Sequence, residues 1–182
     1  MTQLTVSDIF DLFEAHGSSH YGEAVCQTAH ALQSARQAEI DDASPELVIA
    51  ALLHDLGHLF APESPSMFET DDHHEAIGAE RLMPVFGPAV AHPIALHVAA
   101  KRYLCAVDPN YWAGLSPTSK QSLMLQGGPF DDAQRTRFET LPYWRDAVAL
   151  RRYDDSAKTL GAPTSGLSDY RALMERLAAP TT

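Results

Sequence analysis

The sequence has little cysteine, little positive charge and no long apolar run, and each shortage excludes a class of protein. Two cysteines in 182 residues, Cys26 and Cys105, exclude a disulfide-framed secreted module and disfavour a cysteine-based zinc site. No stretch approaches the roughly 18 apolar residues of a membrane span, and acids stand near the start where a secretion signal has basic residues. We therefore expect one domain, residues 1–182, that is cytoplasmic and has no membrane partner.

Positive charge is scarce and also unevenly distributed. Lys and Arg number 13 against 24 Asp and Glu, and the net charge of −11 argues against a nucleic-acid partner. Residues 1–100 carry two basic residues, 15 acidic residues and all nine histidines, whereas residues 101–182 carry 11 basic and 9 acidic residues. The first part has the composition of metal ligands, and the second part could hold an anion. Surface charge also drifts along chains without functional meaning, and composition alone leaves both interpretations open.

Apolar residues recur at helical spacing and nowhere alternate convincingly, which predicts an all-α protein, a single helical bundle. The clearest helix begins at Pro45 after Ser44 as cap, is apolar nearly all round and ends at Gly57, so we expect it to be central and buried. Proline is expected to stop one helix near Pro84 and to begin another near Pro93. The other expected helices cover residues 6–15, 22–38, 73–83, 93–104, 117–126, 131–139, 142–153 and 169–178, the last capped by Ser168.

The strongest local signal for chemistry is the pair His54-Asp55 at the end of the apolar helix. An imidazole and a carboxylate buried there are costly unless they are paired or bind a metal, and a carboxylate can bridge two ions about 3.5–4 Å apart. An exposed helix end that the pair merely caps is the competing interpretation. Because His54 and Asp55 directly follow the apolar run of residues 47–53, we expect them to be buried, which favours metal binding over capping.

Further candidate ligands are expected on other helices. Four histidines and two carboxylates from five helices could fill two sites with a shared carboxylate, a mixture that suits iron or manganese better than structural zinc. A lone histidine on an apolar helix face is more often a core residue, and that alternative holds for each of them taken singly. The candidates beyond the central pair are His30, His73 or His74, His97 and Asp154.

The order and context of these residues resemble the HD-domain superfamily in its six-ligand, two-metal form. More narrowly, the chain resembles the HD-domain mixed-valent di-iron oxygenases, which cleave the carbon–phosphorus bond of hydroxylated organophosphonates. Two of the similar segments, at residues 97–104 and 126–129, are more specific than the His-Asp pair, because simple HD phosphohydrolases do not require them. The similar segments are YGEA (21–24), AALLHDLGH (50–58), HEAIGAERL (74–82), HVAAKRYL (97–104), QGGP (126–129) and RRYDDSAK (151–158).

The resemblance implies a role for each matching residue. One iron would be held by His30, His54, Asp55 and Asp154, and Asp55 would bridge to a second iron held by His74 and His97 as an Fe(II)/Fe(III) pair. His74 rather than His73 matches the family's motif. The positions that match the substrate-binding residues are His58, Lys101, Ser119, Gln126 and Arg151. The candidates for catalytic residues are Glu23 and its neighbour Tyr21.

The segment before Glu23 departs from the family pattern. The family has Tyr three residues before this Glu, whereas here His20 stands at that position and Tyr21 is two before. Aromatic residues could bind a quaternary ammonium through cation–π contacts, or they could equally be core residues. The candidates for such a pocket are Tyr21, Tyr103, Tyr111 and Trp112.

The resemblance implies a di-iron dioxygenase that uses O₂ to convert 2-amino-1-hydroxyethylphosphonate or its N-trimethyl analogue into phosphate and glycine or glycine betaine. The partner would be this small organophosphonate, and the chain would be a monomer or weak homo-oligomer. One alternative is a metal-dependent HD phosphohydrolase that acts on a small phosphate ester or nucleotide with the same ligands and cations. Another is a non-catalytic sensing domain, which has no need of six buried ligands.

Overall fold

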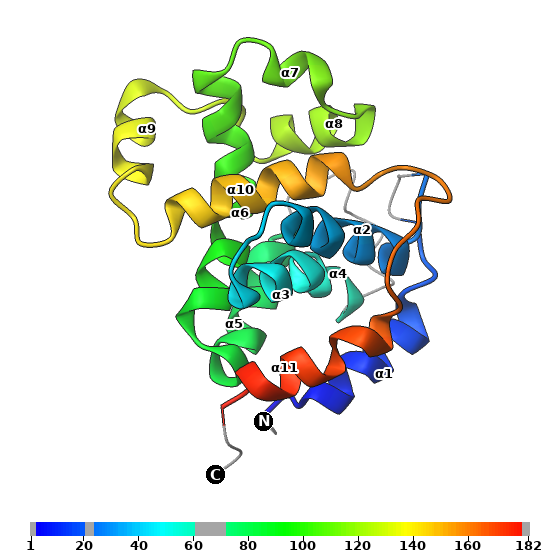
Figure 1. Cartoon of the computed structure of the whole chain (residues 1–182). Helices are drawn as coiled ribbons and strands as arrows, with labels where there is room; N and C mark the ends of the chain where they lie inside the picture. Colours follow the sequence, from blue (N-terminus) through cyan, green and yellow to red (C-terminus); the bar gives the residue numbers. More distant parts are fainter. Residues whose placement is uncertain (1–2, 21–23, 61–71, 180–182) are drawn as a thin grey trace.

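The computed structural model describes residues 3–20, 24–60 and 72–179, and these residues form helices and connecting segments with no strand among them (Figure 1). The expected all-α class is confirmed. In chain order the helices are α1 (Val6–His16), α2 (Gln27–Ile40), α3 (Pro45–Leu53), α4 (Leu56–Leu59), α5 (His74–Phe86), α6 (Pro88–Val107), α7 (Tyr111–Gly114), α8 (Pro117–Leu125), α9 (Asp132–Phe138), α10 (Trp144–Ser156), the 3₁₀ turn η1 (Leu167–Tyr170) and α11 (Arg171–Leu177).

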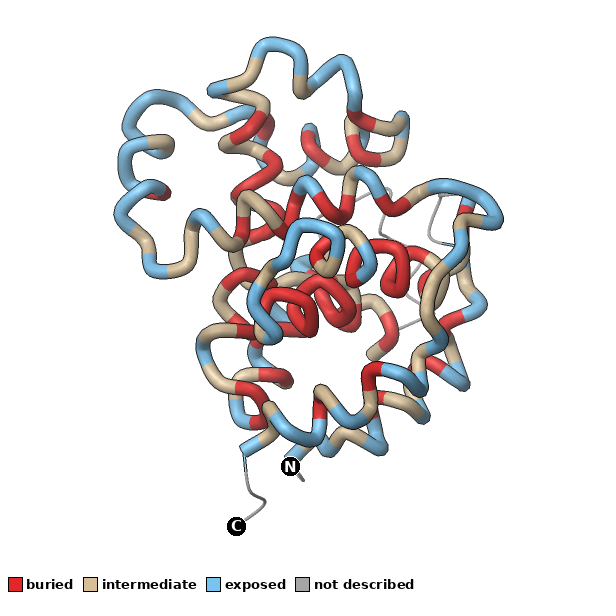
Figure 2. Tube along the Cα trace, in the orientation of Figure 1, coloured by how far each residue is buried: buried red, intermediate tan, exposed pale blue. Residues whose placement is uncertain are grey.

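Helix α3 is the centre of the core, as its apolar sequence predicts. The Ser44 side chain accepts a hydrogen bond from the backbone N–H of Leu47 at 3.2 Å, and Pro45 occupies the first helical position. Every residue from Leu47 to Leu53 is buried, because α2, α6 and α10 pack around this helix (Figure 2). Burial on all sides fixes the end of α3 deep inside the molecule.

The remaining helices cover the two ends of this core. Helices α1 and α11 lie together at one end, near both termini, and α7, α8 and α9 project at the other end beyond α10 (Figure 1). A small second core attaches the projecting part, in which Phe138 of α9 packs with Ala100 of α6 and Ala147 of α10. No helix in the described ranges is long and apolar enough to cross a bilayer.

The end of the central helix differs from the expectation. Helix α3 stops at Leu53, His54 and Asp55 form a turn, and Gly57 lies inside the short helix α4 instead of ending α3. The glycine is required by packing, since a Cβ atom at Gly57 would lie 2.0 Å from the carbonyl oxygen of His74. Its role is to let α4 and α5 approach closely.

Both expected proline boundaries are wrong. Helix α5 continues through Pro84 to Phe86, and α6 begins at Pro88 and contains Pro93. Each proline removes one backbone hydrogen bond, but Phe86 and Ile94 next to them are buried where α5 and α6 pack against each other. Tertiary packing here outweighs the local cost of proline.

Smaller differences concern helix ends. The expected helix 22–38 begins at Gln27, with residues 22 and 23 outside the described ranges. Ser168 lies within η1 rather than capping the last helix, and Asp169 instead accepts a hydrogen bond from the N–H of Gly166 at 2.8 Å. The short helix α7 was not expected from the sequence.

Candidate metal centre

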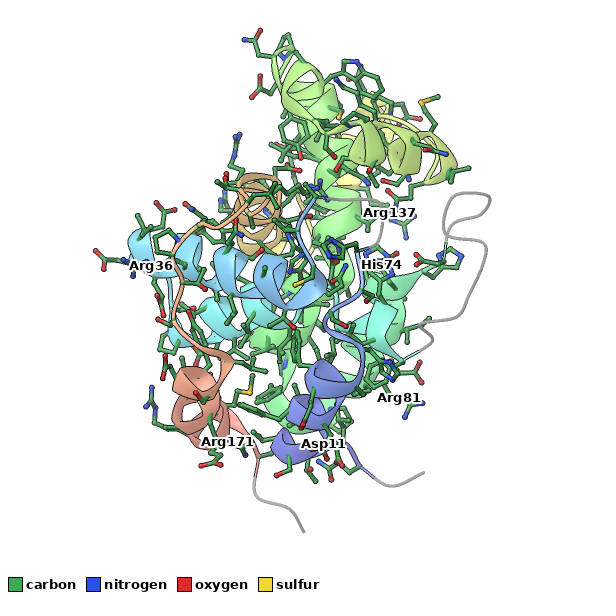
Figure 3. The ribbon with its side chains drawn as sticks, turned by 90° about the vertical axis from the view of Figure 1, so that its right-hand side faces the viewer. Asp11, Arg36, His74, Arg81, Arg137 and Arg171 are labelled. Atoms are coloured by element: carbon green, nitrogen blue, oxygen red, sulfur yellow. The ribbon has the colours of Figure 1, made fainter. Side chains whose placement is uncertain are left out.

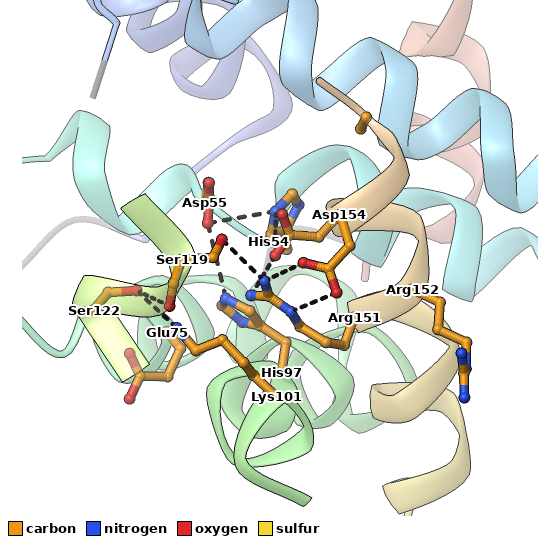
Figure 4. A network of polar contacts seen from close by, with 12 residues as sticks. His54, Asp55, Glu75, His97, Lys101, Ser119, Ser122, Arg151, Arg152 and Asp154 are labelled. Atoms are coloured by element: carbon orange, nitrogen blue, oxygen red, sulfur yellow. Dashed lines mark hydrogen bonds and ion pairs between the residues drawn. The ribbon is translucent and has the colours of Figure 1, made fainter. Parts of the chain in front are cut away.

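The six predicted metal ligands come from different parts of the chain and lie close together, and all of them except His54 line one cavity. Figure 4 labels His54, Asp55, His97 and Asp154. The six ligands fall into two groups, and in each group one ligand atom of every residue lies within 4.8 Å of the others. In Figure 3, His74 lies inside the helical body, whereas Arg36 and Arg171 lie at its periphery. The first group is His30, His54 and Asp154, and the second is Asp55, His74 and His97.

The backbone orients three of the imidazole rings. The Nδ1 atoms of His30, His54 and His97 lie 2.9, 2.9 and 2.8 Å from the carbonyl oxygens of Ala157, Ala51 and Ile94. Because a carbonyl oxygen only accepts, Nδ1 carries the proton, and Nε2 of the neutral ring presents its lone pair to the cavity. Such an outer hydrogen bond is the usual arrangement around metal-binding histidines.

The Nε2 atoms face one another in pairs. His30 Nε2 lies 3.2 Å from His54 Nε2, and His74 Nε2 lies 3.3 Å from His97 Nε2. Two unprotonated nitrogens at this distance repel, so either one of them carries a proton and donates to the other, or a cation lies between them. Two nitrogens bound at a right angle to one ion, each about 2.1 Å from it, are about 3 Å apart. The donor set of four imidazoles and two carboxylates therefore fits two metal ions of the iron or manganese kind.

Asp55 lies between the two groups, as a bridging ligand must. Its Oδ2 is 3.5 Å from His30 Nε2, while its Oδ1 is 3.5 Å from His74 Nε2 and 3.8 Å from His97 Nε2. Burial would raise the pKa of this carboxyl, but the surrounding imidazoles outweigh burial and lower it. Asp55 is therefore ionised, and its Oδ1, which also lies 3.4 Å from Nε2 of His54, contacts both groups.

The histidines differ in protonation because their neighbours differ. Burial lowers the pKa of His54 and lowers that of His97 well below its ordinary value, so both rings are neutral at pH 7. At His30 and His74 burial acts in the same direction but is outweighed by hydrogen bonds to Asp154 and Asp72, which raise the pKa. A bound metal ion would replace the second proton of these rings.

Asp72 is a site residue that the sequence interpretation missed. Its two carboxylate oxygens lie 2.8 Å from Nδ1 of His74 and 2.9 Å from Nδ1 of His58, and the two rings stack with centroids 4.0 Å apart. One carboxylate thus orients a predicted metal ligand and a predicted substrate-binding residue. Its position two residues before His74 was a usable signal in the sequence.

The cavity beside the ligands is small and rich in cations. Its volume is about 100 Å³, and Lys101, Arg151 and Lys158 face it across from the histidines. The Nζ of Lys101 donates to Ser122 Oγ at 2.9 Å, and the lysine is only 2% exposed. Burial, reinforced by the charge of Arg151, lowers the pKa of Lys101 to about 7.

Arg151 connects the ligands to the cavity wall. One nitrogen of its guanidinium lies 2.6 Å from Asp154 Oδ2 (Figure 4). The group also pairs with Asp155 and donates from Nε to the hydroxyl of Tyr111 at 3.1 Å. Ser119 Oγ accepts hydrogen bonds from Lys158 at 3.1 Å and from Arg151 at 3.5 Å. Arg151 neutralises the buried Asp154 and, through Ser119, joins the ligands to the cavity wall.

All five predicted substrate-binding residues line this cavity. They are His58, Lys101, Ser119, Gln126 and Arg151. Sequence reasoning assigned no role to Lys158 or Ser122, which also line it. Lys158 falls in the segment 151–158 and was detectable there as a basic residue four positions after Asp154.

The expected aromatic pocket is not formed by the candidates that can be located. Tyr103 packs against Phe138 and Trp144 at the side of the small second core and donates to Glu139. Tyr111 bonds to Asp155 behind Arg151, and 41% of the Trp112 surface is exposed to solvent. Tyr21 and Glu23 lie outside the described residues.

Comparison with known proteins agrees with this geometry. The family model described as HD domain matches residues 21–122, which include His30, His54, Asp55, His74 and His97. The chain belongs to the HD-domain family. Within that family, it is 46% identical over 173 residues to the hydroxymethylphosphonate dioxygenase of Gimesia maris, a match that covers 93% of this chain and 86% of the relative.

A second relative is the [1-hydroxy-2-(trimethylamino)ethyl]phosphonate dioxygenase (glycine-betaine-forming) of Leisingera caerulea. It is 38% identical over 177 residues, which cover 94% of this chain and 89% of the relative. The two names confirm the resemblance to HD-domain oxygenases that act on phosphonates. They also favour an oxygenase over the alternative of a phosphohydrolase.

Proposed function

We propose that the protein is a di-iron dioxygenase that cleaves the carbon–phosphorus bond of a 1-hydroxyphosphonate. One observation carries the proposal. Two groups of three ligands lie side by side with Asp55 in contact with both, next to a small cavity that three cationic side chains line. The reaction converts R–CH(OH)–PO₃²⁻ and O₂ into R–COOH and HPO₄²⁻. The C–P and C1–H bonds break, and both atoms of O₂ are found in the products.

The small size and the positive charge of the cavity support a small, doubly charged anion as the substrate. A volume of about 100 Å³ is far below the roughly 300–1,000 Å³ of pockets that enclose drug-sized ligands, which disfavours a nucleotide. Both relatives carry names of substrates with a hydroxyl on the carbon that bears the phosphonate. Within this class we propose 2-amino-1-hydroxyethylphosphonate or its N-trimethyl analogue, and hydroxymethylphosphonate is the comparator without an amine.

Two irons would be held by His30, His54 and Asp154 on one side and by His74 and His97 on the other, with Asp55 shared. When bound, an Fe(II)/Fe(III) pair would supply the activation of O₂ and a Lewis acid for the substrate. The protein's own groups bind and orient the phosphonate. Lys101 and Arg151 offset its charge, and Ser119, whose oxygen already accepts from Lys158 and Arg151, has its hydroxyl proton available for a phosphonate oxygen.

Metal analysis combined with an oxygen-dependent assay tests this proposal. Protein from iron-supplied cells should hold close to two irons per chain and show, on partial oxidation, the electron-resonance signal of a coupled Fe(II)/Fe(III) pair. Phosphate should be released from 1-hydroxyphosphonates only when O₂ is present. Full activity with one zinc or magnesium ion, or oxygen-independent release of phosphate from esters, would establish the phosphohydrolase instead. The cytoplasmic location and the monomeric or weakly oligomeric state stay predictions.

A further inference from the structure

Two residues hold Arg151 from the side that faces away from the metal cavity. The hydroxyl of Tyr111 donates a hydrogen bond to Asp155. Arg151 Nε donates to the same hydroxyl at 3.1 Å and to Asp155 Oδ2 at 3.2 Å, and Arg151 Nη2 pairs with Asp155 Oδ1. The guanidinium, the carboxylate and the phenol thus form a closed cluster, in which each group contacts the other two.

This cluster joins a projecting element to α10. Tyr111 is the first residue of the four-residue helix α7, whereas Arg151 and Asp155 lie one turn apart on α10 (Figure 1). Tyr111 and Asp155 line a separate cavity of about 340 Å³, and neither of them lines the cavity beside the metal ligands. A ligand in the metal cavity therefore contacts Arg151 and not the two residues behind it.

The other side of the guanidinium faces the metal centre. Arg151 Nη1 lies 2.6 Å from Asp154 Oδ2, while Asp154 Oδ1 lies 3.3 Å from Nε2 of His30. Arg151 Nη2 lies 3.5 Å from Ser119 Oγ (Figure 4). An arginine that is already ordered before a ligand arrives loses little further rotamer freedom when the ligand binds. Contacts behind Arg151 therefore favour binding in front of it.

Asp155 affects Arg151 in two opposing ways. Its charge partly neutralises the guanidinium, which by itself weakens the attraction for an anion. Its hydrogen bonds hold the guanidinium in one orientation, which favours binding of an anion at a fixed position. Burial would lower the pKa of Arg151, but Asp154 and Asp155 outweigh burial and raise it, so Arg151 stays charged. Removal of the Asp155 charge alone and loss of the orientation thus predict changes of opposite sign in anion binding.

We propose that Tyr111 and Asp155 are positioning residues that act through Arg151 and keep its guanidinium directed at Asp154 and at the phosphonate. This inference rests on the proposed function, because it assumes that a phosphonate binds beside Arg151. It gives the short helix α7 a role, since α7 places Tyr111 against α10. Loosening of the cluster weakens phosphonate binding without removing any group that touches the ligand.

Binding of methylphosphonate to the iron-loaded protein without oxygen measures this effect, because no turnover occurs. Calorimetry should give a dissociation constant about three- to tenfold higher in Tyr111→Phe, the loss expected for one hydrogen bond, with iron content unchanged. Asp155→Asn should weaken binding by at least the same factor. Tighter binding in Asp155→Asn would show that Asp155 acts through its charge alone. That result, or an unaltered dissociation constant in Tyr111→Phe, would overturn the proposal.

Tyr153→Phe and Asp41→Asn are the matched controls. Tyr153 lies on the same helix, α10, and donates its hydroxyl to Asp41 Oδ2 at 2.9 Å, and neither residue lines either cavity. These variants disrupt a tyrosine–aspartate hydrogen bond of the same kind and should leave methylphosphonate binding unaltered. A loss as large as that in Tyr111→Phe would mean that any weakening around α10 has this effect, and the cluster would have no specific role.

Arg151→Lys tests whether Tyr111 acts through Arg151. Lysine keeps the positive charge but lacks the guanidinium fork. Adding Tyr111→Phe to Arg151→Lys should cause no further loss of methylphosphonate binding, because the contact that Tyr111 supports is already absent. A full additional three- to tenfold loss would show that Tyr111 acts independently of Arg151, contrary to the proposal.

Failure of the proposed reaction is distinguishable from failure of this positioning role. If no 1-hydroxyphosphonate releases phosphate but Tyr111→Phe still weakens methylphosphonate binding, the proposed function is wrong and the positioning role is supported. If phosphate is released and Tyr111→Phe binds methylphosphonate like the parent, the positioning role is wrong and the function stands. A parent protein that does not bind methylphosphonate would overturn the positioning role whatever the reaction.

Discussion

At the scale of single residues, Lys101 is a binding residue that lowers the folding stability of the protein. Its ammonium group is buried between α6 and α8, and its pKa is lowered to about 7 by burial and by Arg151. In the unfolded chain the same group has a pKa near 10.5. Between these two values the unfolded chain binds more protons, so folding stability contributed by this group increases as the pH rises from about 7 to 10.

We therefore predict that Lys101→Met stabilises the metal-free protein at neutral pH while weakening phosphonate binding. Thermal unfolding should show a higher Tm than the parent at pH 6.5 and a smaller gain at pH 9. The dissociation constant for methylphosphonate in the iron-loaded protein should rise at least tenfold, an effect typical of losing a buried charge-assisted hydrogen bond, about 1.5–3 kcal/mol. Lys120→Met, on α8 beside Trp112, makes the same change of charge as a control. A lower Tm at pH 6.5 would mean that Lys101 is chiefly structural.

At the scale of elements, the position of His74 depends on how closely α4 and α5 pack. Gly57 faces the backbone of His74, and Gly78 of α5 faces back toward Gly57, where a Cβ would lie 3.3 Å from its nitrogen. Two glycines thus form the contact through which α5 carries His74 to the cavity. Backbone atoms, unlike a flexible side chain, cannot move aside cheaply.

Gly57→Ala should accordingly destabilise the protein and reduce occupancy of the site that contains His74. We expect a loss of about 2–4 kcal/mol in the free energy of unfolding, in the range of severe overpacking, together with iron content nearer one than two per chain. Denaturant unfolding and metal analysis measure the two effects. Gly114→Ala in α7 is the control, because a Cβ there meets nothing within 4 Å. If Gly57→Ala unfolds like the parent with two irons bound, the close contact has no role in placing His74.

At the scale of the whole molecule, the candidate metal centre joins helices from both ends of the chain. His30 on α2, His97 on α6 and Asp154 on α10 come from segments up to 124 residues apart in sequence, and Ala157 after α10 bonds to His30. Ions that bind only the folded arrangement must stabilise it.

Removal of metal should therefore lower the stability of the entire domain and not of one segment. We expect chelation to lower Tm by several degrees in a single cooperative transition, and added iron(II) to restore it, since a ligand at 100 times its Kd contributes about 2.7 kcal/mol. His97→Ala should reduce the gain from iron. His92→Ala, on the same helix but stacked against Tyr143, should keep the full gain. A Tm that chelation leaves unaltered would mean that the six residues do not form a metal site.

The sequence by itself determined the helical class, the buried central helix and the six side chains of the candidate metal centre. Periodicity and the His54-Asp55 pair are local properties, because spacing along a helix follows from its geometry and a buried polar pair needs a partner wherever it lies. The resemblance supplied the remaining ligands and the substrate-binding set. These residues are recognisable because only a few residue types can bind a metal ion or an anion.

Only the tertiary structure decided where helices end and which groups support the site. Helices α5 and α6 continue through Pro84 and Pro93, because burial against neighbouring helices outweighs one missing hydrogen bond. Asp72 acquires its role from two groups that folding brings close to it, the imidazoles of His58 and His74. The sequence alone does not say whether a charged side chain points to solvent or contacts a partner. The answer depends on how elements that are far apart in the chain pack against each other.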